Sequence, residues 1–144
     1  MSNNQYGYQQ PHANPYQQAG WQQSPMIPEQ DRSAAALAHG ASLIAAVFSV
    51  GWLSFLGPLV MWVLYKDRSP HVREAAAGAF NFNIWVNILM VVGKVLTWTL
   101  LFAWIGIPMM IVAGFLMIWA HLRGVMKSMN GKPYVYKHQL RILN

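Results

Sequence analysis

The sequence has no cysteine among its 144 residues, which excludes both a disulfide framework and a thiol nucleophile. Charge is also scarce, because Asp, Glu, Lys and Arg make up 10% of the chain, against roughly 25% in soluble globular proteins. No formal charge occurs from Ser33 to Tyr65, and only Lys94 carries one from Ala75 to Ala120. Uncharged apolar stretches of about 18 or more residues are typical of membrane helices. We therefore expect an integral membrane protein.

Motifs for catalysis and metal binding are absent from the sequence as well. It holds no G-x-S-x-G, Walker or dinucleotide-binding pattern, and its five histidines show no HxxxH or HExxH spacing. Two carboxylates that act as acid and base need contrasting environments, and nothing around Asp67 and Glu74 indicates such a contrast. We expect no enzyme, no cofactor and no metal site.

The net charge of +6 would suggest a nucleic-acid partner in a soluble protein. Here the positive charges flank apolar segments, so lipid headgroups and topology explain them better. We expect the lipid bilayer as the main partner and no nucleic acid. A homo-oligomer and a membrane-protein partner both stay open.

The chain divides into three parts. Residues 1–32 are rich in Gln, Asn, Pro and Tyr, a composition typical of a disordered tail. Residues 33–128 form the predicted membrane bundle, and residues 129–144 form a basic tail. The bundle is an all-α fold of about four transmembrane helices arranged as two helical hairpins. The predicted spans are about 34–50, 55–66, 79–102 and 106–122, with an interfacial amphipathic helix before the third span.

The distribution of charge predicts the topology. The proposed turns near 51–54 and 103–107 contain no Lys or Arg, whereas the middle loop and the C-terminal tail are basic. The positive-inside rule then places the middle loop and both termini in the cytoplasm. A three-span model with the N-terminal tail outside accommodates the same charges.

The middle loop is the strongest local pattern in the chain. Ser69 and Pro70 are suited to an N-cap and a first helical position. Three cations around them are expected to orient the bundle, and a short amphipathic turn leads into the third span. The candidate residues are Lys66, Arg68, Ser69, Pro70, Arg73, Glu74, Asn81 and Phe82.

The third span carries polar residues on one helix face: Asn83, Asn87, Lys94 and Thr97. One reading is a hydrophilic groove or pore wall inside the bundle. The reading we favour has the two asparagines hydrogen-bonding to other helices and Lys94 extending its ammonium group towards the membrane surface.

The loop string FLGPLVMWVLYKDRSPHVREAAAGAFNFNIW and the closing NGKPYVYKHQLRIL resemble a family of small uncharacterised bacterial membrane proteins, a domain of unknown function. That family is distantly similar to the Tic-twenty component of the chloroplast protein-import machinery. The resemblance covers about residues 33–144. It implies a four-helix membrane fold in the bacterial cytoplasmic (inner) membrane and, for the plastid relatives, protein translocation.

Three functions are therefore weighed. The favoured one is a non-enzymatic membrane component, a scaffold or accessory subunit, linked by resemblance to protein translocation. The alternative is a small channel or transporter that uses the polar face of the third span. An enzyme that acts on lipid through Arg73 and Glu74 is the third.

Overall fold

The computed structural model describes residues 26–144, which fold into four helices. They are α1 (Glu29–Phe48), α2 (Leu56–Tyr65), α3 (Pro70–Trp98) and α4 (Ala103–Met129). No strand forms in this part of the chain, so the all-helical prediction is confirmed. Most of the predicted disordered tail, residues 1–25, lies outside the described residues.

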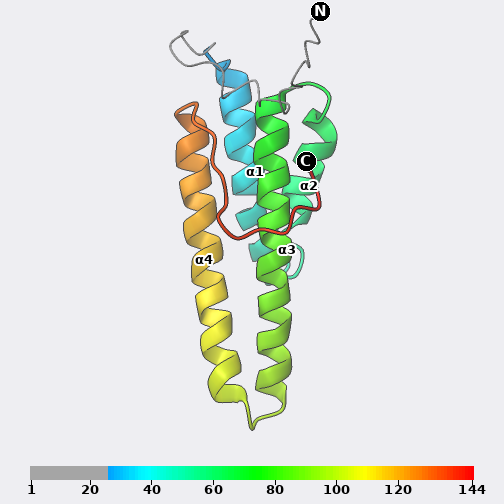
Figure 1. Cartoon of the computed structure of the whole chain (residues 1–144), viewed down its shortest axis with the longest axis vertical. Helices are drawn as coiled ribbons and strands as arrows, with labels where there is room; N and C mark the ends of the chain where they lie inside the picture. The colour runs from blue at the N-terminus through cyan, green and yellow to red at the C-terminus, as the bar shows by residue number, and fades with distance from the viewer. Residues whose placement is uncertain (1–25) are drawn as a thin grey trace, which may run out of the picture.

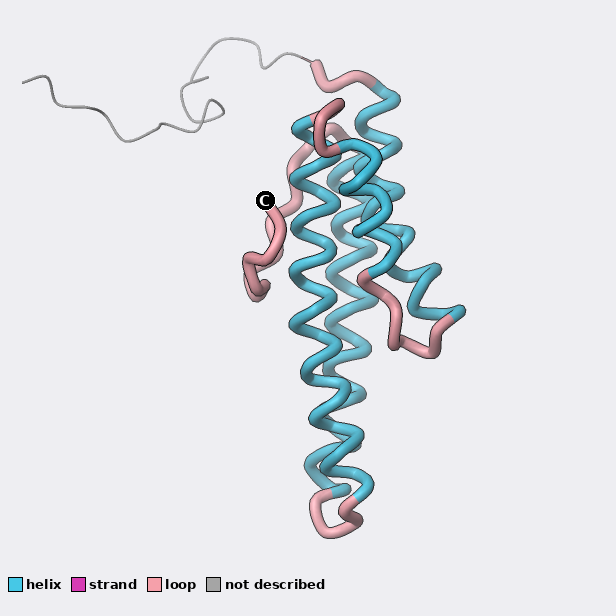
Figure 2. The backbone as a smooth tube through the Cα atoms, turned by 90° about the vertical axis from the view of Figure 1, so that its right-hand side faces the viewer, coloured by secondary structure: helices cyan, strands magenta, loops and turns pink. Residues whose placement is uncertain are grey.

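The helices run up and down as two hairpins of unequal length (Figure 1). Helices α3 and α4 are long and extend well beyond the turn that joins α1 to α2 (Figure 2). Residues 130–144 follow α4 as an irregular segment that runs back along the bundle and crosses α3, and we call this segment the C-terminal strap. One end of the molecule is therefore a thick bundle, and the other is the α3–α4 hairpin alone.

Helix α1 begins at Glu29, so residues 29–32, which we assigned to the tail, are helical. Glu29 and Asp31 occupy the first turn, where carboxylates interact favourably with the positive end of the helix dipole. The small residues Ala34, Ala38 and Ser42 are buried against the neighbouring helices of the same chain. The small face of α1 is thus used for close packing within the bundle.

The turn between α1 and α2 lies at the predicted place, near residues 51–54. Residues 49–55 form the turn, and both Val50 and Gly51 have positive φ angles, 53° and 87°. Helix α2 then has only 10 residues, or about 15 Å at 1.5 Å per residue, about half of a bilayer core. Four complete membrane crossings are therefore not confirmed.

Helices α3 and α4 both differ from their predicted bounds. The amphipathic turn and the third span form one uninterrupted helix, Pro70–Trp98, rather than two elements. Helix α4 begins at Ala103, before the predicted start at residue 106, and continues through Pro108 although proline cannot donate the usual backbone hydrogen bond. The two helices approach closely at Gly93 and Gly106, where a side chain on either glycine would collide with the other helix.

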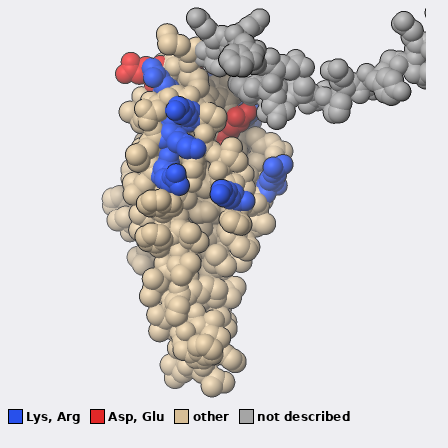
Figure 3. All heavy atoms as spheres, turned by 60° about the vertical axis from the view of Figure 1, so that its left-hand side comes forward, with Lys and Arg blue, Asp and Glu red and all other residues tan. Residues whose placement is uncertain are grey.

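The outer surface of the long hairpin is apolar. Helices α3 and α4 are long and apolar enough to cross a membrane. Only 22% of the most apolar window of α4 is buried in the bundle, unlike a core helix of a soluble protein. On the face in Figure 3, Lys and Arg gather on the thick half of the molecule, and none appears on the tapering half.

Candidate functional site

A buried polar cluster joins α1, α3, α4 and the C-terminal strap. Its central side chains are His39 on α1, Asn83 on α3, His121 on α4 and Tyr136 on the strap, and each is almost completely buried. Tyr136 Oη lies 2.8 Å from His39 Nδ1 and 2.9 Å from His121 Nδ1. Four segments far apart in sequence therefore meet through hydrogen bonds in the interior.

The chemistry of the partners fixes the direction of each hydrogen bond. Asn83 Nδ2 donates to the backbone oxygen of Ser54 and to Ser42 Oγ, both at 3.0 Å. Asn83 Oδ1 therefore accepts, at 2.8 Å, from His121 Nε2. A neutral imidazole then has a lone pair on His121 Nδ1, which receives the Tyr136 hydroxyl proton.

This order leaves one lone pair without a partner. Since the Tyr136 hydroxyl donates to His121, its oxygen accepts from His39 Nδ1. His39 Nε2 is then the acceptor nitrogen of the ring, and it is buried with no hydrogen-bond partner. An unpaired acceptor costs less than an unpaired donor, so this tautomer is the less costly one for the buried ring.

Aromatic contacts hold Tyr136 in place. Its ring stacks on Phe82 with centroids 4.6 Å apart and an interplanar angle of 21°, and Tyr134 packs against it edge-on. Burial, with a smaller contribution from Tyr134, raises the pKa of Tyr136 well above its usual value of 10.0. The phenol therefore stays neutral and keeps the proton that it donates to the cluster.

Asn81 holds the far part of the strap. Its Oδ1 accepts from the backbone nitrogens of Ile142 (3.0 Å) and Leu143 (2.9 Å), while its Nδ2 donates to the backbone oxygen of Leu143 (2.8 Å). Trp62 Nε1 on α2 donates to the backbone oxygen of Asn144 at 3.1 Å. Side chains of α2 and α3 thus bind the backbone of the strap.

The predicted cap at the start of α3 is confirmed. Ser69 Oγ accepts from the backbone nitrogen of Val72 at 3.4 Å, and Pro70 is the first residue of the helix. Ser69 Oγ also donates to Asp31 Oδ2 at 2.7 Å, which connects α1 to the loop before α3. The loop signature is therefore a packing element as well as a helix start.

The other loop residues divide between solvent and a cleft. Lys66 and Arg68 are exposed, and the Lys66 ammonium lies 5.5 Å from the centroid of the Trp62 ring. Arg73 and Glu74 line a cleft of about 490 Å³ between the first half of α3 and the C-terminal strap. No group of three His, Asp or Glu side chains that could hold a metal ion occurs within residues 26–144.

The predicted polar face of α3 meets different neighbours along its length. Asn83 belongs to the buried cluster, and Asn87 Oδ1 accepts from Ser54 Oγ at 3.5 Å. The ammonium of Lys94 lies 3.7 Å from the centroid of the Trp52 ring, on the α1–α2 turn. Thr97 Oγ1 donates to the backbone oxygen of Gly93 within its own helix, at 2.8 Å.

Sequence reasoning singled out Asn83 but not His39 as a candidate, and it also missed two further members of the cluster, His121 and Tyr136. A usable signal was present for the first, because an ionisable residue at the end of an apolar segment marks a buried polar contact. For Tyr136 no periodic pattern exists, since the strap is neither helix nor strand.

A comparison with protein-family models identifies the chain. Residues 30–143 match the model of the Magnetosome magnetite crystal formation protein family. The chain belongs to this family. No curated protein and no solved structure matches it.

Membership of the Magnetosome magnetite crystal formation protein family agrees with the small membrane protein family expected from the loop motif. The matched region begins with α1 and includes the strap, so it contains the whole buried cluster. The comparisons give no support to the similarity to the Tic-twenty component or to protein translocation.

Proposed function

We propose that this chain is a non-enzymatic integral component of the membrane in which magnetite crystals form. The main support for this proposal is the apolar outer surface of the long α3–α4 hairpin, whose side chains have no protein partner in the monomer. The family match supplies the link to the mineral. The pairing of His39, His121 and Asn83 with other protein groups supports a structural role for them.

The placement in the bilayer follows from the uncharged length of the hairpin. Helix α4 has no charge from Ala103 to Leu122, which is about 30 Å at 1.5 Å per residue and equals the thickness of a bilayer core. Trp98 and Trp104 then lie at one interface and Arg123 at the other, as tryptophan and arginine prefer. Helices α3 and α4 are the two complete crossings in this proposal.

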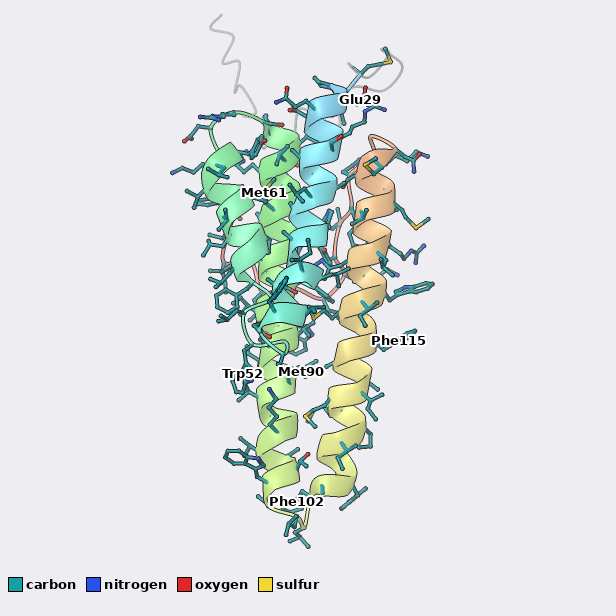
Figure 4. All side chains as sticks on the ribbon, turned by 180° about the vertical axis from the view of Figure 1, so that it is seen from behind. Glu29, Trp52, Met61, Met90, Phe102 and Phe115 are labelled. Carbon is teal, nitrogen blue, oxygen red and sulfur yellow. The ribbon has the colours of Figure 1, made fainter. Side chains whose placement is uncertain are left out.

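In the same placement the α1–α2 hairpin enters the bilayer and returns to the basic side. Gly51 lies beside Met90, eight residues before Trp98, so the turn ends about 12 Å short of the far interface. Trp52 and Met90 lie together above the Phe102 tip in Figure 4. We therefore propose a re-entrant hairpin in place of two further spans.

The hydrogen bonds of the turn suit this depth. Irregular backbone in a membrane must have its polar groups satisfied without water. Five consecutive backbone nitrogens, those of residues 49–53, donate to oxygens of the hairpin itself. Ser49 Oγ accepts one of these bonds, from Leu53 N at 2.8 Å, and the carbonyl of Ser54 accepts from Asn83.

The natural chain has no cysteine, so a single introduced cysteine can be labelled selectively to test the topology. Val50→Cys and Leu100→Cys form a matched pair, since both residues are more than 80% exposed and have φ angles near 55°. An impermeant maleimide should label Leu100→Cys from the side opposite the basic end. It should label Lys132→Cys from the basic side and Val50→Cys from neither side until detergent is added. Equal labelling of Val50→Cys and Leu100→Cys would establish four spans instead.

The link to magnetite has its own test. Deletion of the gene in a magnetite-forming host should change the size or number of crystals measured by electron microscopy, and the wild-type chain should restore them. Unchanged crystals would contradict the role in magnetite formation. They would not affect the proposed membrane topology, which the labelling experiment tests separately. A purified protein that turns over lipid substrates would contradict the non-enzymatic role.

A channel or transporter is the alternative, and a specific contact weighs against it. The ammonium of Lys94 lies on an indole ring, and the cleft around it is walled mainly by apolar side chains. An aqueous path would need a continuous polar lining. Ion or solute flux into liposomes that contain the purified chain, lost in Lys94→Leu, would favour the channel.

A further inference from the structure

We propose that an anionic phospholipid binds beneath the α1–α2 turn, with its phosphate at Lys94. This inference rests on the proposed topology. A cleft of about 370 Å³ lies at this place, between the turn and the middle of α3. Gly51, Trp52 and Phe55 form its upper wall, and Ile88 and Val91 belong to its wall on α3.

Lys94 is a cation without a protein counter-ion. The four acidic residues of the chain are Glu29, Asp31, Asp67 and Glu74, and all lie at or before the start of α3. Glu74 is the acid nearest to Lys94 in sequence, and it lies 20 residues earlier on the same helix, about 30 Å away. A buried or membrane-embedded ammonium therefore has to find its counter-charge outside the chain.

The position of the Lys94 side chain agrees with a ligand in the cleft. Lys94 lies one helical turn before Trp98, yet its ammonium is over the Trp52 ring and not extended past the end of α3. An aromatic ring attracts a cation through its quadrupole but carries no net charge. The ammonium thus stays in the apolar cleft with its charge uncompensated.

The ammonium of Lys94 suits the oxygens of a phosphodiester, to which it can donate charge-assisted hydrogen bonds.

The remaining walls suit acyl chains. Ile88, Val91, Val92 and Val95 are each more than 40% exposed on α3. A lipid of the leaflet next to the α3–α4 tip has its headgroup near Trp98 and its chains directed towards the bilayer centre. Such a lipid fills the space that a re-entrant hairpin leaves uncovered, and its negative charge complements Lys94.

Native mass spectrometry of the full chain in detergent tests the proposal. The wild type should retain phosphatidylglycerol in preference to phosphatidylcholine. Lys94→Met should reduce that retention about tenfold, the effect of losing one charge-assisted hydrogen bond, and Lys94→Arg should keep it. Lys127→Met is the matched control. The Lys127 ammonium also lies over an aromatic ring, that of Tyr134, but it belongs to the last turn of α4, away from the α3–α4 tip.

The outcomes separate the possibilities. Equal retention of phosphatidylglycerol by wild type and Lys94→Met would overturn the site, and Lys94→Gln gives a second reading if Lys94→Met fails to fold. Competition by soluble glycerol phosphate as effective as that of the lipid would show a site for a free anion and overturn the lipid assignment. Labelling of Val50→Cys tests the topology separately, because lipid retention is measured in micelles.

Discussion

Gly124 of α4 packs directly against the imidazole ring of His39 of α1. A Cβ atom built on Gly124 would lie 2.7 Å from Cγ and 2.8 Å from Nδ1 of that ring. The same Nδ1 atom donates to Tyr136, so the ring cannot move away without breaking a buried hydrogen bond. The glycine therefore fixes the distance between α1 and α4 at the level of the polar cluster.

Gly124→Ala should destabilise the folded chain by about 1–3 kcal/mol, the usual cost of overpacking a rigid interior. Gly114→Ala is the control on the same helix, because a Cβ at Gly114 meets no atom within 4 Å. That change should be neutral or should stabilise by up to about 1 kcal/mol through helix propensity. Thermal unfolding in detergent compares the two variants, and equal stabilities would show that α1 and α4 do not touch at Gly124.

Asn83→Leu should destabilise the chain by about 1–3 kcal/mol, because it leaves the buried His121 Nε2–H and the Ser54 carbonyl without partners. Asn87→Leu should cost much less, since Asn87 makes one bond at 3.5 Å and its own Nδ2 is unpaired. Chemical or thermal unfolding of both variants in the same micelles measures the difference. A larger loss of stability in Asn87→Leu than in Asn83→Leu would show that Asn83 does not make the main stabilising contact of this helix face.

Local signals in the sequence predicted part of this structure. The Ser69 cap and the turn at Gly51 depend on a few neighbouring residues, and both appear as expected. The start of α1 was misplaced because charge was read as the end of the membrane segment, although Glu29 and Asp31 favour a helix start. Helix α4 begins at Ala103, three residues before the predicted start, and Pro108 lies inside the helix.

Long-range contacts could not be predicted in the same way. The polar character of Asn83 indicated a hydrogen bond to another helix, but its partner His121 is 38 residues away and no periodicity connects them. The strap shows the same limit, because Asn81 binds backbone atoms of residues 142 and 143, which have no distinguishing side chains. Such pairings depend on how the helices pack, which a single sequence does not encode locally.

Tyr136→Phe should destabilise the chain by about 1–3 kcal/mol while leaving the fold intact. The change keeps the ring stacked on Phe82 but removes the hydroxyl that bridges His39 and His121. Tyr134→Phe is the matched control, since no hydrogen bond of the Tyr134 hydroxyl occurs among the described residues and its ring is only partly buried. Unfolding by heat measures both, and a Tyr136→Phe protein as stable as Tyr134→Phe would show that the bridge contributes nothing.

Asn81→Ala should release the end of the C-terminal strap. Asn81 makes three hydrogen bonds to the backbone of Ile142 and Leu143, each worth about 0.5–1.5 kcal/mol, so their loss should raise the detached population at least about tenfold. Trypsin should then cut faster after Lys137 and Arg141 in mild detergent. Asn130→Ala is the control, because the Asn130 amide bonds only to the backbone oxygen of Met126 at the end of α4. The Tyr136 cluster stays intact in both variants, so a strap that still resists cleavage in Asn81→Ala would locate its attachment at Tyr136 rather than at Asn81.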